Sequence, residues 1–257
     1  MQYVRFLDKS GRESYGSLEN GLVTRIQGSI FGDHALTGEK YAPEDIKFLT
    51  PCTPVNLYCV GLNFADHVAE LGLPTPLQPA NFLKPVSAVI PTGEAIVIPH
   101  VSTRTDYEGE MGIVIKNKIK NIAETEALQH ILGVTPLNDV TEREMSYTST
   151  LVTYSKSFDT FTSFGPVIDT EIDPENTVIR TFLNGEQVQE GRTAEFIFSC
   201  AYIVAFFSKG RTLYPGDIIS TGTPSHVLPL KAGDVVEVEI EGIGYRLINP
   251  VKQEVLE

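Results

Sequence analysis

The sequence predicts a β-rich α+β fold with a few flanking helices and a small N-terminal β unit. Short apolar or alternating runs, separated by Gly, Pro and Asn, recur along most of the chain, as expected for strands. The clearest hairpin joins residues 178–183 to residues 186–189 through Asn184-Gly185, because Asn-Gly suits a type I′ turn. Helical patterns occupy only residues 64–71, 123–132 and 194–208.

The first 50 residues contain strand patterns and little that could perform chemistry. Residues 3–7 and 21–26 have strand character, and residues 8–12 between them are typical of a turn. Pro51 and Pro54 mark a plausible boundary. We therefore expect a small N-terminal β-rich domain over residues 1–50, packed against a main domain over residues 51–257.

A short helix should follow the apolar strand at residues 55–60. Asn63 is a suitable N-cap, Phe64, Val68 and Leu71 form an apolar stripe, and Gly72 ends the pattern. About two turns of helix are marginal unless something packs on them. This helix is therefore a candidate lid that orders when ligand binds.

His67 and Glu70 lie three residues apart on this predicted helix. At that spacing a carboxylate can orient and polarise an imidazole. The alternative is a surface ion pair on an amphipathic helix. The two interpretations remain open on the residues alone.

Residues 106–115 are predicted as one strand, preceded by a strand pair on either side of residues 92–94. Alternation places Asp106, Glu108 and Glu110 on one face, with apolar side chains on the other. Crowded carboxylates that lead into a core need positive charge, and Mg²⁺, Mn²⁺ or Ca²⁺ would provide it. The alternative is an exposed acidic edge strand.

A third carboxylate follows in the next strand, residues 133–140, which comes after the helix 123–132 and its expected stop at Gly133. Asn138-Asp139 either contributes to a site at the strand end or begins a turn.

Each of two lysines also has a structural and a functional interpretation. Lys84 is either a surface lysine or a pocket cation, and Lys156 either pairs with Asp159 or acts in catalysis.

The C-terminal part should alternate one helix with strands. Thr193 is expected to cap a buried helix over residues 194–208, which ends at Gly210. Strands are predicted at residues 217–220, 234–240 and 245–248. Residues 221–224 form a hydroxyl-rich turn that either holds a carboxylate or is only a turn.

Composition excludes several classes of function. The formal net charge is −13 with no Lys/Arg cluster, so nucleic acid would be repelled. No run of 18 or more apolar residues is present for a membrane span, and no secretory signal is visible, which favours a cytoplasmic location. Cys52, Cys59 and Cys200 lack metal-site spacing and fit buried thiols in a reducing compartment. The expected partners are small molecules.

Seven segments together resemble the fumarylacetoacetate hydrolase family, with order and spacing that agree from about residue 51 to the C-terminus. They are residues 61–67 with Glu70, 82–85, 107–110, 138–143, 156–161, 183–186 with Gln189, and 215–217 with 221–224. Two stretches depart from the family pattern. Ser225-His226 replaces a more usual small residue and Gly, and residues 144–155 are rich in Ser and Thr.

The resemblance implies a mixed β-sheet roll, a homodimer and a divalent metal, Mg²⁺ or alternatively Mn²⁺ or Ca²⁺. The implied site residues are the metal ligands Glu108, Glu110 and Asp139, the acid/base dyad His67 and Glu70 on a mobile lid, the catalytic Lys156, and the substrate contacts Lys84, Arg143, Gln189, Thr221, Gly222 and Thr223. Asp106 has no ligand role in the resembled family, so it is expected behind the site or facing solvent.

The implied substrate is a 2-oxo acid with a second carbonyl or carboxylate nearby, of the kind met in aromatic catabolism. The expected activity is hydrolysis of a C–C bond in 2,4-dioxo acids of the acylpyruvate type, with the metal stabilising the enolate. Oxaloacetate-type decarboxylation and isomerisation or decarboxylation of a 2-hydroxyhepta-2,4-diene-1,7-dioate are the alternatives. A non-catalytic 2-oxo acid binding protein is a further alternative class.

Overall fold

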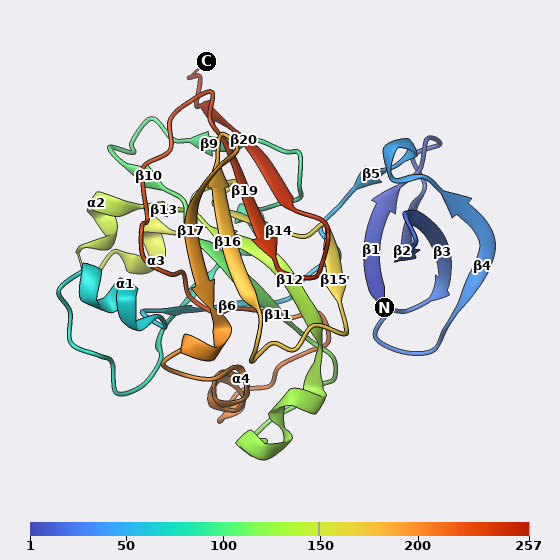
Figure 1. Ribbon diagram of the computed structural model, residues 1–257, viewed down its shortest axis with the longest axis horizontal. Helices are drawn as coiled ribbons and strands as arrows, with labels where there is room; N and C mark the ends of the chain where they lie inside the picture. Colours follow the sequence, from blue (N-terminus) through green and yellow to red (C-terminus); the bar gives the residue numbers. More distant parts are fainter. Residues whose placement is uncertain (149, 257) are drawn as a thin grey trace.

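β-Strands are the main regular element of the computed structural model, which describes residues 1–148 and 150–256 (Figure 1). The strands assemble into one large mixed sheet, a five-stranded sheet and a two-stranded ribbon. The predicted β-rich α+β fold is confirmed. Ser149, within the Ser/Thr-rich stretch, and Glu257, at the end of the expected main domain, lie outside the described residues.

The N-terminal strands form the blue group at one side of the molecule in Figure 1. The strands β1 (Gln2–Leu7), β2 (Glu13–Glu19), β3 (Leu22–Gly28) and β4 (His34–Tyr41) are antiparallel neighbours in chain order, and β5 (Lys47–Phe48) also pairs with β1. Strand β1 continues the large sheet by pairing with β15 (Val167–Asp169). The N-terminal unit therefore shares a hydrogen-bonded sheet with the rest of the chain.

The centre of the large sheet carries the acidic residues. Strand β12 (Ile131–Asp139) is antiparallel to β11 (Gly109–Ile115), and β11 pairs on its other edge with β18 (Ile218–Ser220). Every residue of β11 is buried, as expected for its apolar residues, and Glu110 is the one acid among them. The sheet continues through β6 (Leu57–Gly61) and β7 (Ala80–Lys84), while β14 (Thr162–Phe164) and β8 (Val89–Ile90) extend from β12.

The second sheet has the order β17 (Glu186–Arg192), β16 (Val178–Leu183), β19 (Val235–Ile240), β20 (Leu247–Gln253) and β9 (Ile96–Ile98). The predicted Asn-Gly hairpin joins β16 to β17, with φ of 54° at Asn184 and 85° at Gly185. Met111 and Ile113 of the large sheet share a core cluster with Ile179 and Val238 of this one. The two sheets thus pack face to face around the main core.

Four short α-helices accompany the sheets in the described residues: α1 (Ala65–Glu70), α2 (Arg143–Ser146), α3 (Val152–Ser155) and α4 (Cys200–Ser208). The expected start of the last helix at Thr193 is wrong. Thr193 begins a 3₁₀ turn, η4 (Thr193–Glu195), and Ser199 caps α4 by accepting a bond from the Tyr202 N–H at 3.1 Å. Phe196, between them, leaves the helical path to bridge Phe64.

The predicted helix over residues 123–132 is present, but it is of the 3₁₀ type and its expected end is wrong. Residues 124–130 form the 3₁₀ helix η3 (Glu124–His130), and β12 already begins at Ile131. Gly133 therefore lies in a strand rather than at a helix end. A Cβ at this position would lie 2.2 Å from the carbonyl oxygen of Asp169, so the close approach of β15 requires glycine.

Three further expectations need correction. The strands flanking residues 92–94, β8 and β9, lie in different sheets rather than pairing. The expected strand 106–115 is interrupted, because β10 (Thr105–Asp106) pairs with β13 (Thr141–Glu142) and β11 begins only at Gly109. Asn63 does not cap α1, which follows Phe64; its side chain instead bonds the backbone of Phe198 and Thr221.

Within residues 1–148 and 150–256, no helix has the length and apolar character needed to cross a lipid bilayer.

Candidate active site

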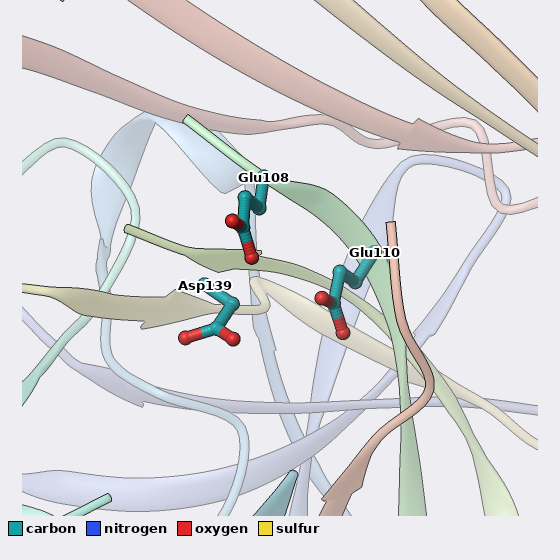
Figure 2. Close-up of side chains that lie close together, drawn as sticks. All are labelled: Glu108, Glu110 and Asp139. Carbon is teal, nitrogen blue, oxygen red and sulfur yellow. The ribbon is translucent and has the colours of Figure 1, made fainter. Parts of the chain in front are cut away.

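Three buried carboxylates meet at the end of the central strand pair. One oxygen each from Glu108, Glu110 and Asp139 can be chosen so that all lie within 4.8 Å of one another. Figure 2 shows the three side chains pointing toward a common space. The pairing of β11 with β12 brings Gly109 opposite Asn138, so the residues on either side of Gly109 lie beside Asp139. The structure thus brings together the three predicted metal ligands.

Lys156 lies inside this acidic cluster. Its Nζ donates to Oε2 of Glu108 at 2.6 Å, to Oδ2 of Asp139 at 2.7 Å and to Oγ1 of Thr141 at 2.7 Å. The alternative pairing with Asp159 is wrong in the described part of the chain, since Asp159 is exposed and Lys156 is buried. Lys156 therefore shares its positive charge between two of the three acids.

Lys84 binds the other carboxylate oxygen of Asp139. Its Nζ donates to Oδ1 of Asp139, to the Phe161 carbonyl at 2.6 Å and to the Val140 carbonyl at 3.2 Å. The side chain has no exposed area, so the surface-lysine alternative is wrong. Lys84 fixes Asp139 from behind, and it does not border the cavity described below.

Arg143 links the cluster to Asp106. Its Nη2 donates to Oε1 of Glu108, and its Nε donates to Oδ2 of Asp106 at 2.8 Å. Asp106 is fully buried and also accepts from Nε of Arg104 at 2.9 Å. The solvent-facing alternative for Asp106 is therefore wrong, and this acid holds Arg143 in place behind Glu108.

The two glutamates have opposite electrostatic surroundings. Burial alone would raise the pKa of Glu108, but Lys156 and Arg143 outweigh it and hold that pKa below its ordinary value. Burial together with Asp139 and Glu108 raises the pKa of Glu110 well above its ordinary value. Glu110 accepts from the Ser220 hydroxyl and, at 2.8 Å, from the Gly222 N–H. Among the described residues it forms no ion pair with Lys, Arg or His.

These residues fit a hard divalent cation. The donor set consists only of carboxylate oxygens, which Mg²⁺, Mn²⁺ and Ca²⁺ prefer. In the described part of the chain Glu110 is a buried carboxylate without a cationic side chain, and such a group is costly unless it is protonated or paired. A cation bound there would supply the missing positive charge.

The predicted dyad lies on α1 beside this cluster. Nδ1 of His67 is 3.0 Å from Oε2 of Glu70. His67 is 5% exposed, whereas the Glu70 side chain is 38% exposed, so the pair is not a simple surface contact. The bond to Glu70 occupies Nδ1, and among the described residues Nε2 has no hydrogen-bond partner.

A cavity of about 690 Å³ is bordered by His67 of the dyad and by two of the acids, Glu108 and Glu110. This volume is in the usual range for small-molecule sites. Its chemically active lining residues are His67, Glu108, Glu110, Arg143, Lys156 and Thr223. The remainder of the lining includes apolar groups such as Leu71 and Phe82 and hydroxyl groups such as Tyr147 and Thr153.

Three of the predicted substrate contacts instead hold the site together. Thr221 Oγ1 donates to the Met111 carbonyl at 2.8 Å, and the Gly222 N–H is used by Glu110. Gln189 Nε2 donates to Oγ1 of Thr223 at 3.1 Å and to backbone carbonyls beyond it. These three and Lys84 do not border the cavity, whereas Arg143 and Thr223 do.

Sequence reasoning missed two residues beside Lys156. Thr141 accepts one of its hydrogen bonds, and the Phe82 ring centroid lies 4.9 Å from Nζ. Phe82 precedes Lys84 by two positions on β7, a spacing that predicts a shared face. For Thr141 no local pattern indicates the contact, because it depends on how residues far apart in the chain meet.

Comparison with known proteins places these features in a family. Residues 56–252 match the family described as fumarylacetoacetate (FAA) hydrolase C-terminal, and residues 1–51 match Rv2993c-like, N-terminal. An uncharacterised protein of Methanocaldococcus jannaschii is 51% identical over 78% of this chain and 84% of its own length. The human mitochondrial oxaloacetate tautomerase FAHD2A is 38% identical, over 80% of this chain and 70% of its own length.

A solved structure is similar to this chain over nearly its whole length. The crystal structure of 5-carboxymethyl-2-hydroxymuconate delta-isomerase from Mycobacterium smegmatis matches with a TM-score of 0.91 and 34% identity. The match covers 99% of this chain and all of that one. Similarity therefore extends over the N-terminal unit as well as over the strands that carry the acids.

Proposed function

The chain belongs to the fumarylacetoacetate hydrolase family, and we propose that it is a metal-dependent enzyme that moves a proton on a 2-oxo acid, as a keto–enol tautomerase or double-bond isomerase. Two named relatives support this order of preference, one an oxaloacetate tautomerase and the other a hydroxymuconate isomerase. The sequence alone favoured hydrolysis, with isomerisation as an alternative. Both reactions start from the same site.

The observation that carries the proposal is the buried imidazole of His67 on the cavity that also contains Glu108 and Glu110. Glu70 holds Nδ1, so Nε2 can accept a proton from a bound molecule and return it to another atom. Keto–enol and double-bond isomerisation need this shuttling of one proton. They need neither a leaving group nor a water molecule.

A divalent cation held by Glu108, Glu110 and Asp139, for which we propose Mg²⁺, would supply Lewis-acid stabilisation of the negative charge that develops on the 2-oxo group. His67 then removes a proton from the carbon beside the keto group. Glu70 stabilises the imidazolium that forms, through the bond at Nδ1. The proton returns from His67 to the oxygen in a tautomerase, or to a more distant carbon in an isomerase.

Lys156 contributes a fixed positive charge rather than a base. Burial would lower the pKa of Lys156, but Asp139 and Glu108 outweigh it and hold the pKa above its ordinary value. The ammonium group therefore stays protonated at neutral pH. It borders the cavity, where it can stabilise an anionic substrate or intermediate together with Arg143.

Hydrolysis of a C–C bond is the second candidate, and the intact dyad favours it. His67 could take its proton from a water molecule instead of from carbon, and the cavity of about 690 Å³ has room for both water and a small acid. Decarboxylation would use Lys156 and Arg143 without the dyad. These reactions differ in their products, so a direct assay separates them.

The experiment is a substrate panel with purified protein, Mg²⁺ and an EDTA control. The panel contains oxaloacetate in its enol form, a 2-hydroxydienedioate and an acylpyruvate, with ultraviolet absorbance and product analysis as readouts. Proton transfer predicts interconversion of isomers with no change in carbon count. Pyruvate release from the acylpyruvate would support hydrolysis instead, and absence of turnover on all three would reject both.

A further inference from the structure

One turn contacts both halves of the site. Ser220, at its start, and Gly222 donate hydrogen bonds to Glu110, which has no cationic partner among the residues that the structure describes. Three residues later the same turn reaches the helix that carries His67. Residues 220–226 therefore connect the carboxylate cluster to the dyad.

Two residues of this turn bind α1 on both sides of His67. The Ser225 hydroxyl donates to Oδ2 of Asp66 at 2.6 Å, and the Ser225 N–H lies 3.3 Å from the same oxygen. The His226 N–H donates to Oε1 of Glu70 at 3.0 Å. Because Asp66 and Glu70 are four residues apart on one helix face, these bonds restrain the helix at two successive turns.

The turn is itself fixed to strands and loops of the main body. Gln189 Nε2 donates to the carbonyls of Pro224 at 2.9 Å and Ser225 at 3.1 Å, and the Tyr107 hydroxyl donates to the His226 carbonyl at 3.0 Å. His226 has a φ of 70°, in the left-handed region that favours glycine. Bonds on both sides of this residue hold it in that conformation, with its N–H aimed at Glu70.

Helix α1 needs such an anchor. It contains six residues, too few to be stable alone, and the Phe64 cap residue provides no side-chain bond to its first turn. Glu70 is partly exposed, so its carboxylate would move freely without a second partner. The His226 N–H and Nδ1 of His67 together restrict it.

We propose that Ser225 and His226 are positioning residues, which hold α1 against the cavity and keep the Glu70 carboxylate on the imidazole of His67. This inference rests on the proposed function, since it assumes that His67 moves the proton. Ser225 acts through its side chain, and His226 acts through its backbone N–H. Neither residue needs to touch the substrate.

Ser225→Ala tests the side-chain contact. The expected result is a fall in kcat of ~10- to 100-fold, because a slightly misplaced dyad loses its alignment, with KM within about twofold. Ser225→Thr, which keeps the hydroxyl, should restore most of kcat. Ser10→Ala is the matched control, since the Ser10 hydroxyl donates to Asp8 at 2.5 Å in the N-terminal unit. Equal kcat for Ser225→Ala and Ser10→Ala would overturn the proposal.

His226→Pro and His226→Gly separate backbone from side chain. Proline has no N–H and cannot adopt a positive φ. Glycine has the N–H and adopts a positive φ readily. We expect the larger loss of kcat for His226→Pro, and no further loss when it is added to Glu70→Ala. Equal losses for His226→Pro and His226→Gly, or losses that add fully to that of Glu70→Ala, would contradict the assignment.

A measurement without substrate keeps this inference separate from the proposed function. Nitrogen-15 NMR of the His67 ring reports whether the proton stays on Nδ1, where Glu70 holds it. Circular dichroism first checks that Ser225→Ala is folded. The variant should then shift this signal toward a mixture of tautomers, even if no substrate has been found. An unchanged His67 signal would overturn the positioning role. An altered signal in a protein inactive on the whole panel would reject only the proposed function.

Discussion

Lys156 Nζ lies 2.6 Å from Oε2 of Glu108, deep in the same cluster of acids that fits a divalent cation. The lysine and a metal ion would thus share a carboxylate as partner. Their positive charges repel each other, but three acids and a bound anionic substrate compensate them. The charges of the site therefore suit the binding of a metal ion and an anion at the same time.

Lys156→Met should separate binding of metal from catalysis. Removing the ammonium group takes away a competing cation, so Mg²⁺ should bind at least as tightly, measured by titration calorimetry. The value of kcat should fall by about 100-fold or more, since a fixed charge beside the developing anion is lost. Unchanged kcat, or loss of Mg²⁺ binding, would contradict the role given to Lys156.

Glu110→Gln should weaken metal binding directly. The variant keeps the shape of the side chain but removes the carboxylate that has no cationic partner. Even residues that only support a metal ligand cost tenfold or more in affinity, so a loss of at least about tenfold is expected in calorimetry with Mg²⁺. Glu144→Gln, an exposed glutamate on α2, is the control and should bind normally. Equal affinities for the two variants would remove Glu110 from the ligand set.

Lys84→Met should destabilise the fold. The side chain has no exposed area, and its loss leaves Oδ1 of Asp139 and two buried carbonyls without this donor, while Lys156 still binds Oδ2. Breaking a buried ion pair costs about 3–5 kcal/mol in free energy of unfolding. Lys9→Met is the matched control, because Lys9 and Asp45 form an exposed pair that should contribute ~1 kcal/mol or less. Urea unfolding of the metal-free variants compares them, and similar midpoints would refute this prediction.

Glu142→Gln should change the acid dependence of stability. Burial raises the pKa of Glu142, but N–H groups of Met145, Thr103 and Arg104 outweigh it, so the pKa is below its ordinary value. The charged carboxylate therefore stabilises the fold above its unfolded pKa of about 4.3, and this contribution is lost as pH falls through the folded pKa.

The Glu142→Gln variant should accordingly cost about 2 kcal/mol at pH 7, the scale of hydrogen bonds to a charged group. Below about pH 4 the difference from the parent protein should shrink as the parent's carboxylate is protonated. Unfolding in urea at pH 7, 5 and 3.5 measures this trend. A difference that stays constant across the three pH values would contradict it.

Local signals predict the acidic cluster only in part, because they leave a surface strand and a turn as alternatives, and the ligand set is implied by the family resemblance. Glu108 and Glu110 are two positions apart, and Asp139 ends a clear apolar strand. Alternation predicts an unbroken strand over residues 106–115, but the structure interrupts it before Gly109. The two glutamates still face one space because Gly109 pairs with Asn138 and the Glu108 N–H bonds the Asn138 side chain.

The cationic and supporting residues were harder to assign, because their partners are distant in sequence. Lys84 meets Asp139 from 55 residues away, and no pattern near Lys84 distinguishes that contact from a surface position. Gln189 and Gly222 seemed suited to a substrate, but the fold uses their polar groups internally. Helix ends were misjudged where apolar content continued past a change of direction, as at Phe196.

Proton exchange at the carbon beside the keto group tests the central claim most directly. The parent protein and His67→Ala are compared in D₂O with Mg²⁺, following loss of the C3 proton signals of a slowly exchanging 2-oxo acid by NMR. We predict that the parent protein accelerates exchange above a Mg²⁺-only blank, and that His67→Ala and EDTA each remove most of the acceleration. Two results would contradict proton transfer by His67. One is acceleration of exchange that survives in His67→Ala, and the other is no acceleration by the parent protein with any compound of the substrate panel.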